Sequence, residues 1–251
     1  MSVIARQASA VPDRMAVWAV LSTFGLAVTG GVAAFGGILV TSLLASTLGI
    51  AGTDAYAVVA RSGTQVGFAV VAVVFLMIAG DRVRYVKLRW PTLEDLGWIA
   101  VLPFVLFAVS AGLTLVLPAI GISTPSASHG AEGTKALLID RPILWVVVIP
   151  GLYVFAAPVE ELLYRGIVQG RLRPHLGTVG IVLVSAVAFG LMHTIVFALS
   201  PPEHFVYSIL SISGAGAVWA VVYERTENLA VTAVNHAMSW TVPFGALIPF
   251  V

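Results

Sequence analysis

Four ionisable side chains lie within long apolar stretches of the sequence, where a charged group is costly and usually faces a cavity or a partner. Glu160 and Glu161 are neighbours in one stretch, and His193 and His236 lie in two later stretches. A carboxylate with two imidazoles can take a proton from water and stabilise an oxyanion, which is the chemistry of hydrolysis. This set predicts a polar site. Three interpretations are compatible with this site. The protein could be a hydrolase or a transporter that relays protons through a carboxylate, or the histidines could only join helices by hydrogen bonds.

The spacing around the two glutamates gives them different surroundings on a helix. Glu161 and Arg165 are four residues apart and can pair on one helix face. Glu160 points about 100° away from Glu161 at 3.6 residues per turn. One carboxylate can therefore be a structural ion-pair partner while the other faces a cavity. Of the remaining histidines, we expect His204 to lie in a loop, and His129 and His175 to be solvated.

The composition indicates which elements must position these side chains. Of 251 residues, 59% are apolar and 10% are charged, whereas soluble domains carry about 25% charged residues. The net charge of +1 implies no nucleic-acid partner. The chain has no cysteine, which excludes disulfides, thiolate metal sites and a cysteine nucleophile. We expect an all-α, polytopic bundle of transmembrane helices with membrane lipid around it.

Seven apolar segments are candidates for spanning helices, which need about 20 residues each. The first is too long for a signal peptide, and Gly30-Gly31 or Gly36-Gly37 in it either break the helix or let another helix approach closely. With a cytoplasmic N-terminus, only Arg61, Lys135 and Arg141 of the 13 Lys and Arg residues lie outside, which favours that orientation. The segments are about 16–47, 63–80, 97–117, 142–170, 177–199, 205–223 and 228–250.

Three motifs in the second half of the chain together resemble a known family. Glu160-Glu161-Leu162-Leu163-Tyr164-Arg165 has the pattern Glu-Glu-x-x-x-Arg, Phe189 and His193 form Phe-x-x-x-His, and His236 follows in the last helices. This order is similar to that of the CPBP intramembrane proteases, the family of CAAX prenyl endopeptidases and of bacteriocin-processing or immunity proteins. The resemblance covers about residues 140–250. It divides one integrated membrane domain into N-terminal helices, 1–139, and a catalytic core, 140–251.

The resemblance implies a glutamate-dependent endopeptidase that acts within the membrane of a prokaryote, at the plasma membrane. Glu160 would be the base that activates water, His193 would position that water and His236 would donate to the oxyanion. Glu161 and Arg165 would hold the first motif in register. The substrate would be a membrane-associated or prenylated peptide or protein. Zinc or another divalent metal on Glu160, His193 and His236 stays open, although the sequence lacks the His-Glu-x-x-His helix of common zinc proteases.

One position departs from the family pattern. The family commonly has Asn or Asp four residues after the third histidine, where this chain has Trp240. Asn235 is a neighbouring amide that could support the site, but it lies about 100° around the helix from His236. Either a neighbour replaces the missing amide or the oxyanion site is weaker. A non-catalytic scaffold or immunity protein of the same fold is therefore the alternative function, ahead of a proton-coupled transporter.

Overall fold

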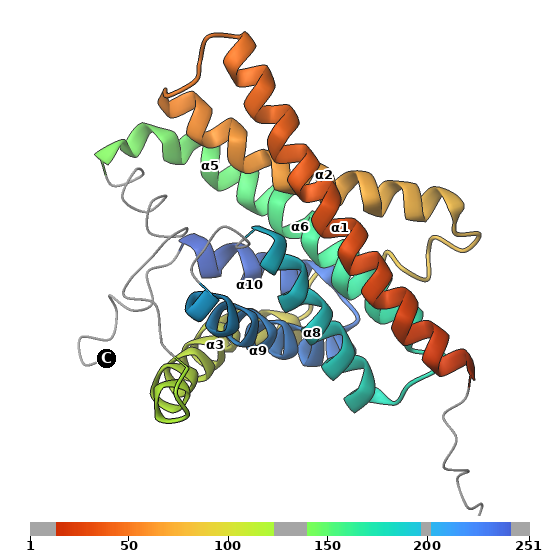
Figure 1. The fold of residues 1–251 in the computed structure, drawn as a ribbon. Coiled ribbons are helices and arrows are strands. Elements are labelled where there is room, and N and C mark those ends of the chain that lie inside the picture. Colours follow the sequence, from red (N-terminus) through yellow and green to blue (C-terminus); the bar gives the residue numbers. More distant parts are fainter. Residues whose placement is uncertain (1–13, 123–139, 197–201, 242–251) are drawn as a thin grey trace, which may run out of the picture.

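The computed structural model describes residues 14–122, 140–196 and 202–241, and every regular element in these ranges is a helix (Figure 1). This confirms the all-α fold. The helical segments match the seven predicted ones, although the end of the last, 242–250, lies outside the described residues. The segments are α1 (Arg14–Thr47), α2 (Asp54–Ile78), α3 (Leu93–Ala119), a long helix over Pro142–Leu172, α8 (Thr178–Val196), α9 (Pro202–Thr226) and α10 (Leu229–Thr241).

The long helix changes its hydrogen-bond pattern around the two glutamates. It begins with the 3-10 turn η1 (Pro142–Leu144) and α5 (Trp145–Pro150), and it ends with α7 (Gly170–Leu172). Between them, α6 (Ala157–Glu161) is flanked by two π-helical stretches, η2 (Gly151–Ala156) and η3 (Leu162–Gln169). Pro158 has no N–H to donate to the preceding turn, which favours the wider turn of η2 before it. Such π-helical insertions occur frequently at functional sites.

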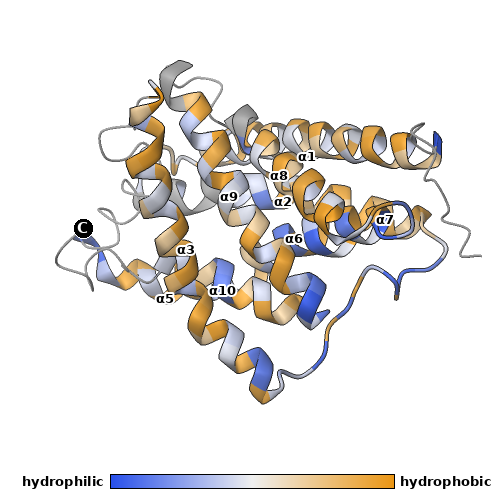
Figure 2. Cartoon of the chain, turned by 90° about the horizontal axis from the view of Figure 1, so that it is seen from below, coloured by the Kyte–Doolittle hydropathy of each residue, from blue (hydrophilic) through white to orange (hydrophobic). Residues whose placement is uncertain are grey.

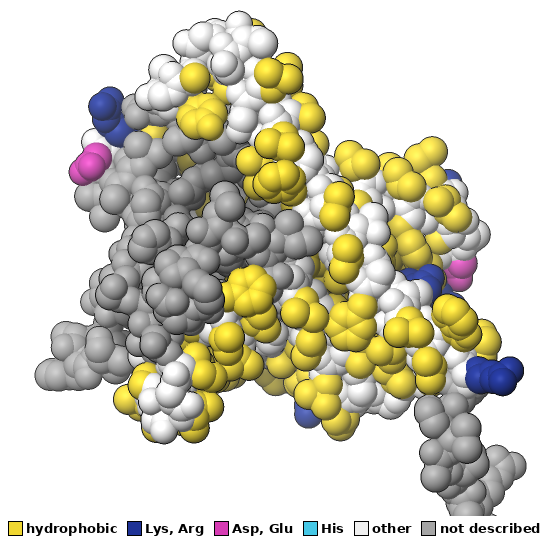
Figure 3. Space-filling model, in the orientation of Figure 1, with side chains coloured by type: hydrophobic (Ala, Val, Ile, Leu, Met, Phe, Trp, Pro, Cys, Tyr) yellow, Lys and Arg dark blue, Asp and Glu magenta, His cyan; other side chains and the backbone are white. Residues whose placement is uncertain are grey.

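The outer surface of the bundle is apolar, as lipid requires. Among the described residues, four helices are long and apolar enough to cross a membrane: α1, α3, the long helix and Phe205–Thr226 of α9. Ser62–Ile78 of α2 and Thr178–His193 of α8 are apolar but shorter. Figure 3 shows hydrophobic side chains spread over the visible face, and Figure 2 shows hydrophilic residues gathered mainly at helix ends and around α6. The chain is therefore an integral membrane protein.

Helices α1 and α2 meet backbone to backbone. A side chain added at Gly37 would overlap the carbonyl group of Gly63, and one added at Gly67 would overlap the backbone of Ala33. Helix α1 continues without interruption past these glycines. The prediction that a glycine pair allows close approach is thus confirmed at Gly37, and the alternative of a break in this helix is wrong.

The remaining helices bring the second half of the chain against this pair. Helix α1 packs on α2 and α8, α8 packs on α9, and α3 packs on α9 and α10 (Figure 1). Helix α10 also packs on α6, and α2 contacts α6 and η3 from the other side. Helix α6 consequently lies in the interior of the bundle, between helices from both halves of the chain.

The connector after α2 anchors the turn between α9 and α10. The N–H of Leu229, at the start of α10, donates to the carbonyl oxygen of Lys87 at 2.9 Å. Nη2 of Arg89 donates to the carbonyl oxygen of Thr226 at 2.9 Å, where α9 ends. Arg89 also pairs with the buried Asp95. These bonds fix where α10 begins, and α10 carries His236.

Asp95 is also part of the N-terminal cap of α3. The side chain of Thr92 accepts from the N–H of Asp95, and the carboxylate of Asp95 accepts from the N–H of Thr92, which forms a capping box. Nδ2 of Asn228 donates to the same carboxylate at 3.4 Å. One buried carboxylate thus links the start of α3 to the start of α10.

Candidate active site

Three helices bring the predicted site residues to one point. Nε2 of His193, on α8, and Nε2 of His236, on α10, each lie 3.8 Å from Oε2 of Glu160, on α6. The side chains of Glu160 and His236 are 2% and 3% exposed, and that of His193 is 20% exposed. The structure therefore brings together all three residues, and the partly exposed histidine marks the more open side of the cluster.

The two oxygens of Glu160 have different surroundings. Oε1 accepts a hydrogen bond of 3.2 Å from Nε2 of Gln65, on α2. Oε2 is buried and has no hydrogen-bond partner among the described residues. A distance of 3.8 Å is longer than a direct hydrogen bond, and a buried acceptor without a partner is destabilising. A small polar molecule held jointly by Oε2 and the two imidazoles would satisfy this oxygen.

Glu161 orients His236. Its Oε1 lies 2.9 Å from Nδ1 of His236, and its Oε2 accepts from Nε of Arg165 at 3.0 Å. All three groups are buried. An ionised carboxylate only accepts hydrogen bonds, so Nδ1 of His236 carries the proton and Nε2 points toward Glu160. The predicted Glu161–Arg165 ion pair is present, and it extends to the catalytic candidate on another helix.

The imidazole of His193 is oriented by a hydrogen bond within its own helix. Nδ1 of His193 lies 2.8 Å from the carbonyl oxygen of Phe189, which can only accept. Nδ1 is therefore the donor here as well, and Nε2 faces Glu160. In the neutral form, both imidazoles present an acceptor to the same carboxylate oxygen. The site thus gathers three proton acceptors, so one water molecule can donate to two of them while a proton bound to the third turns it into a donor.

The segment that holds this geometry matches a known family. Residues 142–242 match the family model described as type II CAAX prenyl endopeptidase Rce1-like. This part of the chain is therefore similar to that family. No curated protein and no solved structure matches the chain. The matched residues include Glu160, His193 and His236, which confirms the resemblance seen in the sequence and supports protease activity of the CAAX type at the level of the family.

Two tryptophans hold the imidazole of His236 in this CAAX-protease-like core. The ring of Trp219, on α9, stacks on His236 with centroids 4.2 Å apart. Trp240, the residue that departs from the family pattern, contacts His236 with centroids 4.4 Å apart. Trp240 thus packs against the imidazole, where the family commonly has a carboxylate or an amide.

Asn235 is linked to His236 through Trp219. Its Oδ1 accepts from Nε1 of Trp219 at 2.8 Å, and the indole N–H is only a donor, so the amide oxygen must face it. Nδ2 of Asn235 is buried without a hydrogen-bond partner in the described part of the chain. Asn235 therefore positions the ring that stacks on His236.

Two of these supporting residues could not be assigned from the sequence. Gln65 lies 95 positions before Glu160, and its only signal is an amide near the start of an apolar stretch. Trp219 has the composition of a packing residue, and its N–H and ring contacts depend on the rotation of α9. Of the other histidines, His175, which we expect to be solvated, is half-buried in the turn after α7. His204 lies in the first turn of α9, so its loop prediction is wrong. His129 lies outside the described residues.

The donor types at the site are ones that zinc binds. Among the described residues, however, no group of three or more His, Asp or Glu side chains is arranged to hold a metal ion. Metal dependence, with Glu160, His193 and His236 as ligands, therefore stays a prediction from donor chemistry.

Proposed function

We propose that the protein is an intramembrane endopeptidase that uses Glu160 as its general base. The observation that supports this most directly is the convergence of two imidazole Nε2 atoms, each at 3.8 Å, on one buried carboxylate oxygen without a direct partner among the described residues. A transporter needs a relay path across the membrane, whereas hydrolysis needs only this compact set. The family match adds that proteases of the CAAX type are built on this segment.

The proposed reaction begins with water between Glu160 and the two imidazoles. Glu160 Oε2 takes a proton from this water while the water oxygen forms a bond to the carbonyl carbon of the substrate. His193 Nε2 accepts the second hydrogen bond and sets the direction of attack. Water held by two acceptors keeps its lone pairs free for the carbonyl carbon, which is the requirement for general-base catalysis.

The second stage depends on His236. When its Nε2 is protonated, His236 can donate to the oxyanion, and Glu161 then carries the compensating negative charge next to Nδ1. Collapse of the tetrahedral intermediate breaks the C–N bond, and the proton held by Glu160 passes to the leaving nitrogen. The products are a carboxylic acid, which keeps the second proton of the water, and an amine, and Glu160 returns to its ionised form.

The substrate class follows from the position of the site. Glu160 and His236 are buried in a bundle with an apolar outer surface, which supports a substrate that is itself held in the membrane. A peptide or protein that is membrane-associated or prenylated fits this access. We place the protein in the plasma membrane of a prokaryote, with the basic helix ends and the N-terminus in the cytoplasm.

The test compares purified wild-type protein with Glu160→Gln in a cleavage screen of membrane peptides, with and without a chelator. We expect Glu160→Gln to lower kcat about 100-fold or more, which is the usual contribution of a general base. Glu94→Gln is the matched control, because Glu94 is an exposed carboxylate at the start of α3. Full activity in a folded Glu160→Gln variant would refute the proposal. The absence of cleavage by wild-type protein would favour the scaffold or immunity role.

A further inference from the structure

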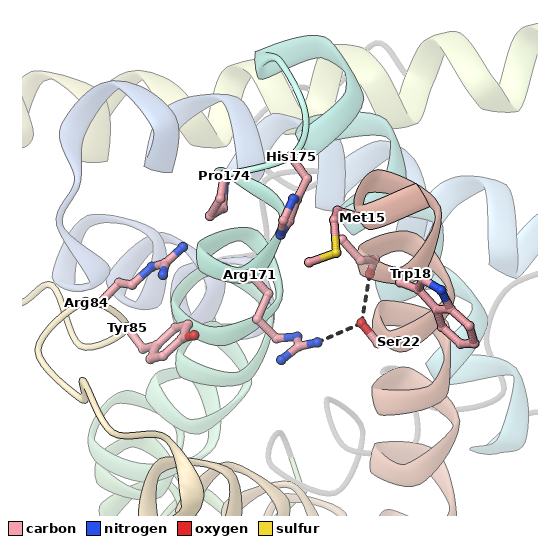
Figure 4. Close-up of a pocket in the computed structure, with 9 residues that line it drawn as sticks. Met15, Trp18, Ser22, Arg84, Tyr85, Arg171, Pro174 and His175 are labelled. Atoms are coloured by element: carbon pink, nitrogen blue, oxygen red, sulfur yellow. Dashed lines mark hydrogen bonds between the residues drawn. The ribbon is translucent and has the colours of Figure 1, made fainter. Parts of the chain in front are cut away.

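A pocket lies at the basic end of the bundle, between α1, the connector after α2 and the end of the long helix. It encloses about 400 Å³. Arg84, Arg171 and His175 line it with basic groups, and Trp18 and Tyr85 add aromatic rings (Figure 4). No acidic residue is among its described lining residues. The cavity thus has the charge of an anion site.

The two arginines are held in place by neutral groups. Nη2 of Arg171 donates to Oγ of Ser22 at 2.7 Å, which directs the guanidinium from α7 toward α1 (Figure 4). Nη2 of Arg84 donates to the carbonyl oxygen of Gly170 at 3.2 Å. Neither guanidinium forms an ion pair with a carboxylate in the part of the chain that the structure describes. Both therefore retain donors and a full positive charge for a ligand.

Three neighbouring basic residues, in contrast, form ion pairs with carboxylates. These pairs are Lys87–Glu227, Arg89–Asp95 and Arg173–Glu224. Asp81 lines an adjoining hollow, and its Oδ1 accepts from the backbone N–H of Arg84 at 3.3 Å. These ion pairs neutralise Lys87, Arg89 and Arg173, whereas Arg84 and Arg171 have no carboxylate partner among the described residues.

The pocket also borders the lipid-facing surface. Trp18 is 66% exposed, and exposed tryptophan is typical of the interface between lipid and water. The adjoining hollow, of about 320 Å³, shares Arg84, Tyr85 and Arg171 with the pocket and continues along Phe75 and Ile78 of α2. Ile78 is strongly exposed. A ligand could therefore place an anionic group on the arginines and an apolar chain along α2.

We propose that this pocket binds the phosphodiester headgroup of an anionic membrane phospholipid. Arginine presents several donors in a planar fork that matches phosphate oxygens. Basic pockets between transmembrane helices on the cytoplasmic side suit such headgroups, because the anionic lipids of that leaflet supply the charge. The bound lipid would join α1, the connector and α7, which are otherwise linked here by few polar contacts.

Native mass spectrometry of the full-length protein tests this proposal. The protein in neutral detergent is titrated with phosphatidylglycerol or with phosphatidylcholine, and retained lipids are counted. We expect one phosphatidylglycerol to be retained preferentially, and Arg84→Gln/Arg171→Gln to weaken its binding about tenfold or more. Arg84→Gln alone, at an exposed position, should give part of this loss if the double variant folds poorly.

The matched control is Arg82→Gln/Arg225→Gln, which removes the same charge from exposed positions that do not line the pocket. Equal binding by the wild type and the double pocket variant would overturn the proposal. An equal loss in the control would do the same, because it would show diffuse surface attraction. If inorganic phosphate displaces phosphatidylglycerol at equal concentration, the pocket is a free-anion site and the lipid assignment fails. The measurement needs no turnover, so its result is independent of the proposed protease.

Discussion

Glu160 and Glu161 are adjacent in the chain, yet they have separate tasks because a helix turns them apart. Glu161 binds Arg165 and Nδ1 of His236, whereas Glu160 faces Nε2 of both histidines. A protonated His236 therefore lies between two carboxylates, one at each ring nitrogen. Either carboxylate can compensate the positive charge of the ring in that form.

This arrangement predicts the effect of Glu161→Gln. The glutamine oxygen can still accept from Nδ1, so the ring keeps its orientation, but the negative charge that stabilises protonated His236 is lost. We expect kcat to fall about 10- to 100-fold with little change in KM, because the lost charge stabilises the transition state that leads to the oxyanion and not the bound substrate. Steady-state kinetics on a cleaved membrane peptide would measure it. A change in KM alone would contradict this role.

At the scale of elements, α1 and α2 form a pair that supports the site from outside, because α2 contributes Gln65 to Glu160. The pair depends on two glycine contacts at which the helix backbones touch. Its stability therefore rests on the absence of side chains at these points. The connector after α2 has the same supporting function for α10, through Lys87 and Arg89.

The glycine contact predicts a difference between two adjacent residues. In Gly37→Ala the added methyl group overlaps the backbone of Gly63, which should lower stability by about 1–3 kcal/mol, the usual effect of overpacking. Gly36→Ala is the control, since nothing lies within 4 Å of its added methyl group. Thermal unfolding in detergent measures both. Equal unfolding temperatures for the two variants would show that the α1–α2 contact is not tight.

At the scale of the whole molecule, an ion pair joins the connector after α2 to the turn between α9 and α10 at the basic end of the bundle. These two segments are distant in sequence. Lys87 donates to Glu227, 140 residues further on. This hydrogen bond lowers the pKa of Glu227 below its ordinary value of 4.5, against a smaller opposing effect of burial. The contact lies outside the membrane-spanning segments, so solvent pH reaches it.

The lowered pKa of Glu227 makes the free energy of unfolding depend on pH. The folded protein binds the Glu227 proton only at a lower pH than the unfolded chain does. The contact therefore stabilises fully above the ordinary pKa and loses its contribution as the pH falls through the lower, folded value. We expect a small effect, since the Glu227 side chain is 55% exposed. Thermal unfolding at neutral and acidic pH should show less acid sensitivity in Glu227→Gln and in Lys87→Gln, and identical curves would exclude the coupling.

The sequence by itself determined the helical membrane fold, because apolar runs of this length leave few alternatives in lipid. It also indicated Glu160, His193 and His236 as candidate site residues, since ionisable groups are rare within such runs. Only the tertiary structure decided that Gln65 reaches Glu160, that Trp219 stacks on His236, and that Gly37 rather than a break in α1 allows close packing. These contacts join residues far apart in sequence. They depend on the rotation and crossing of helices, which many weak packing interactions set together and no local pattern records.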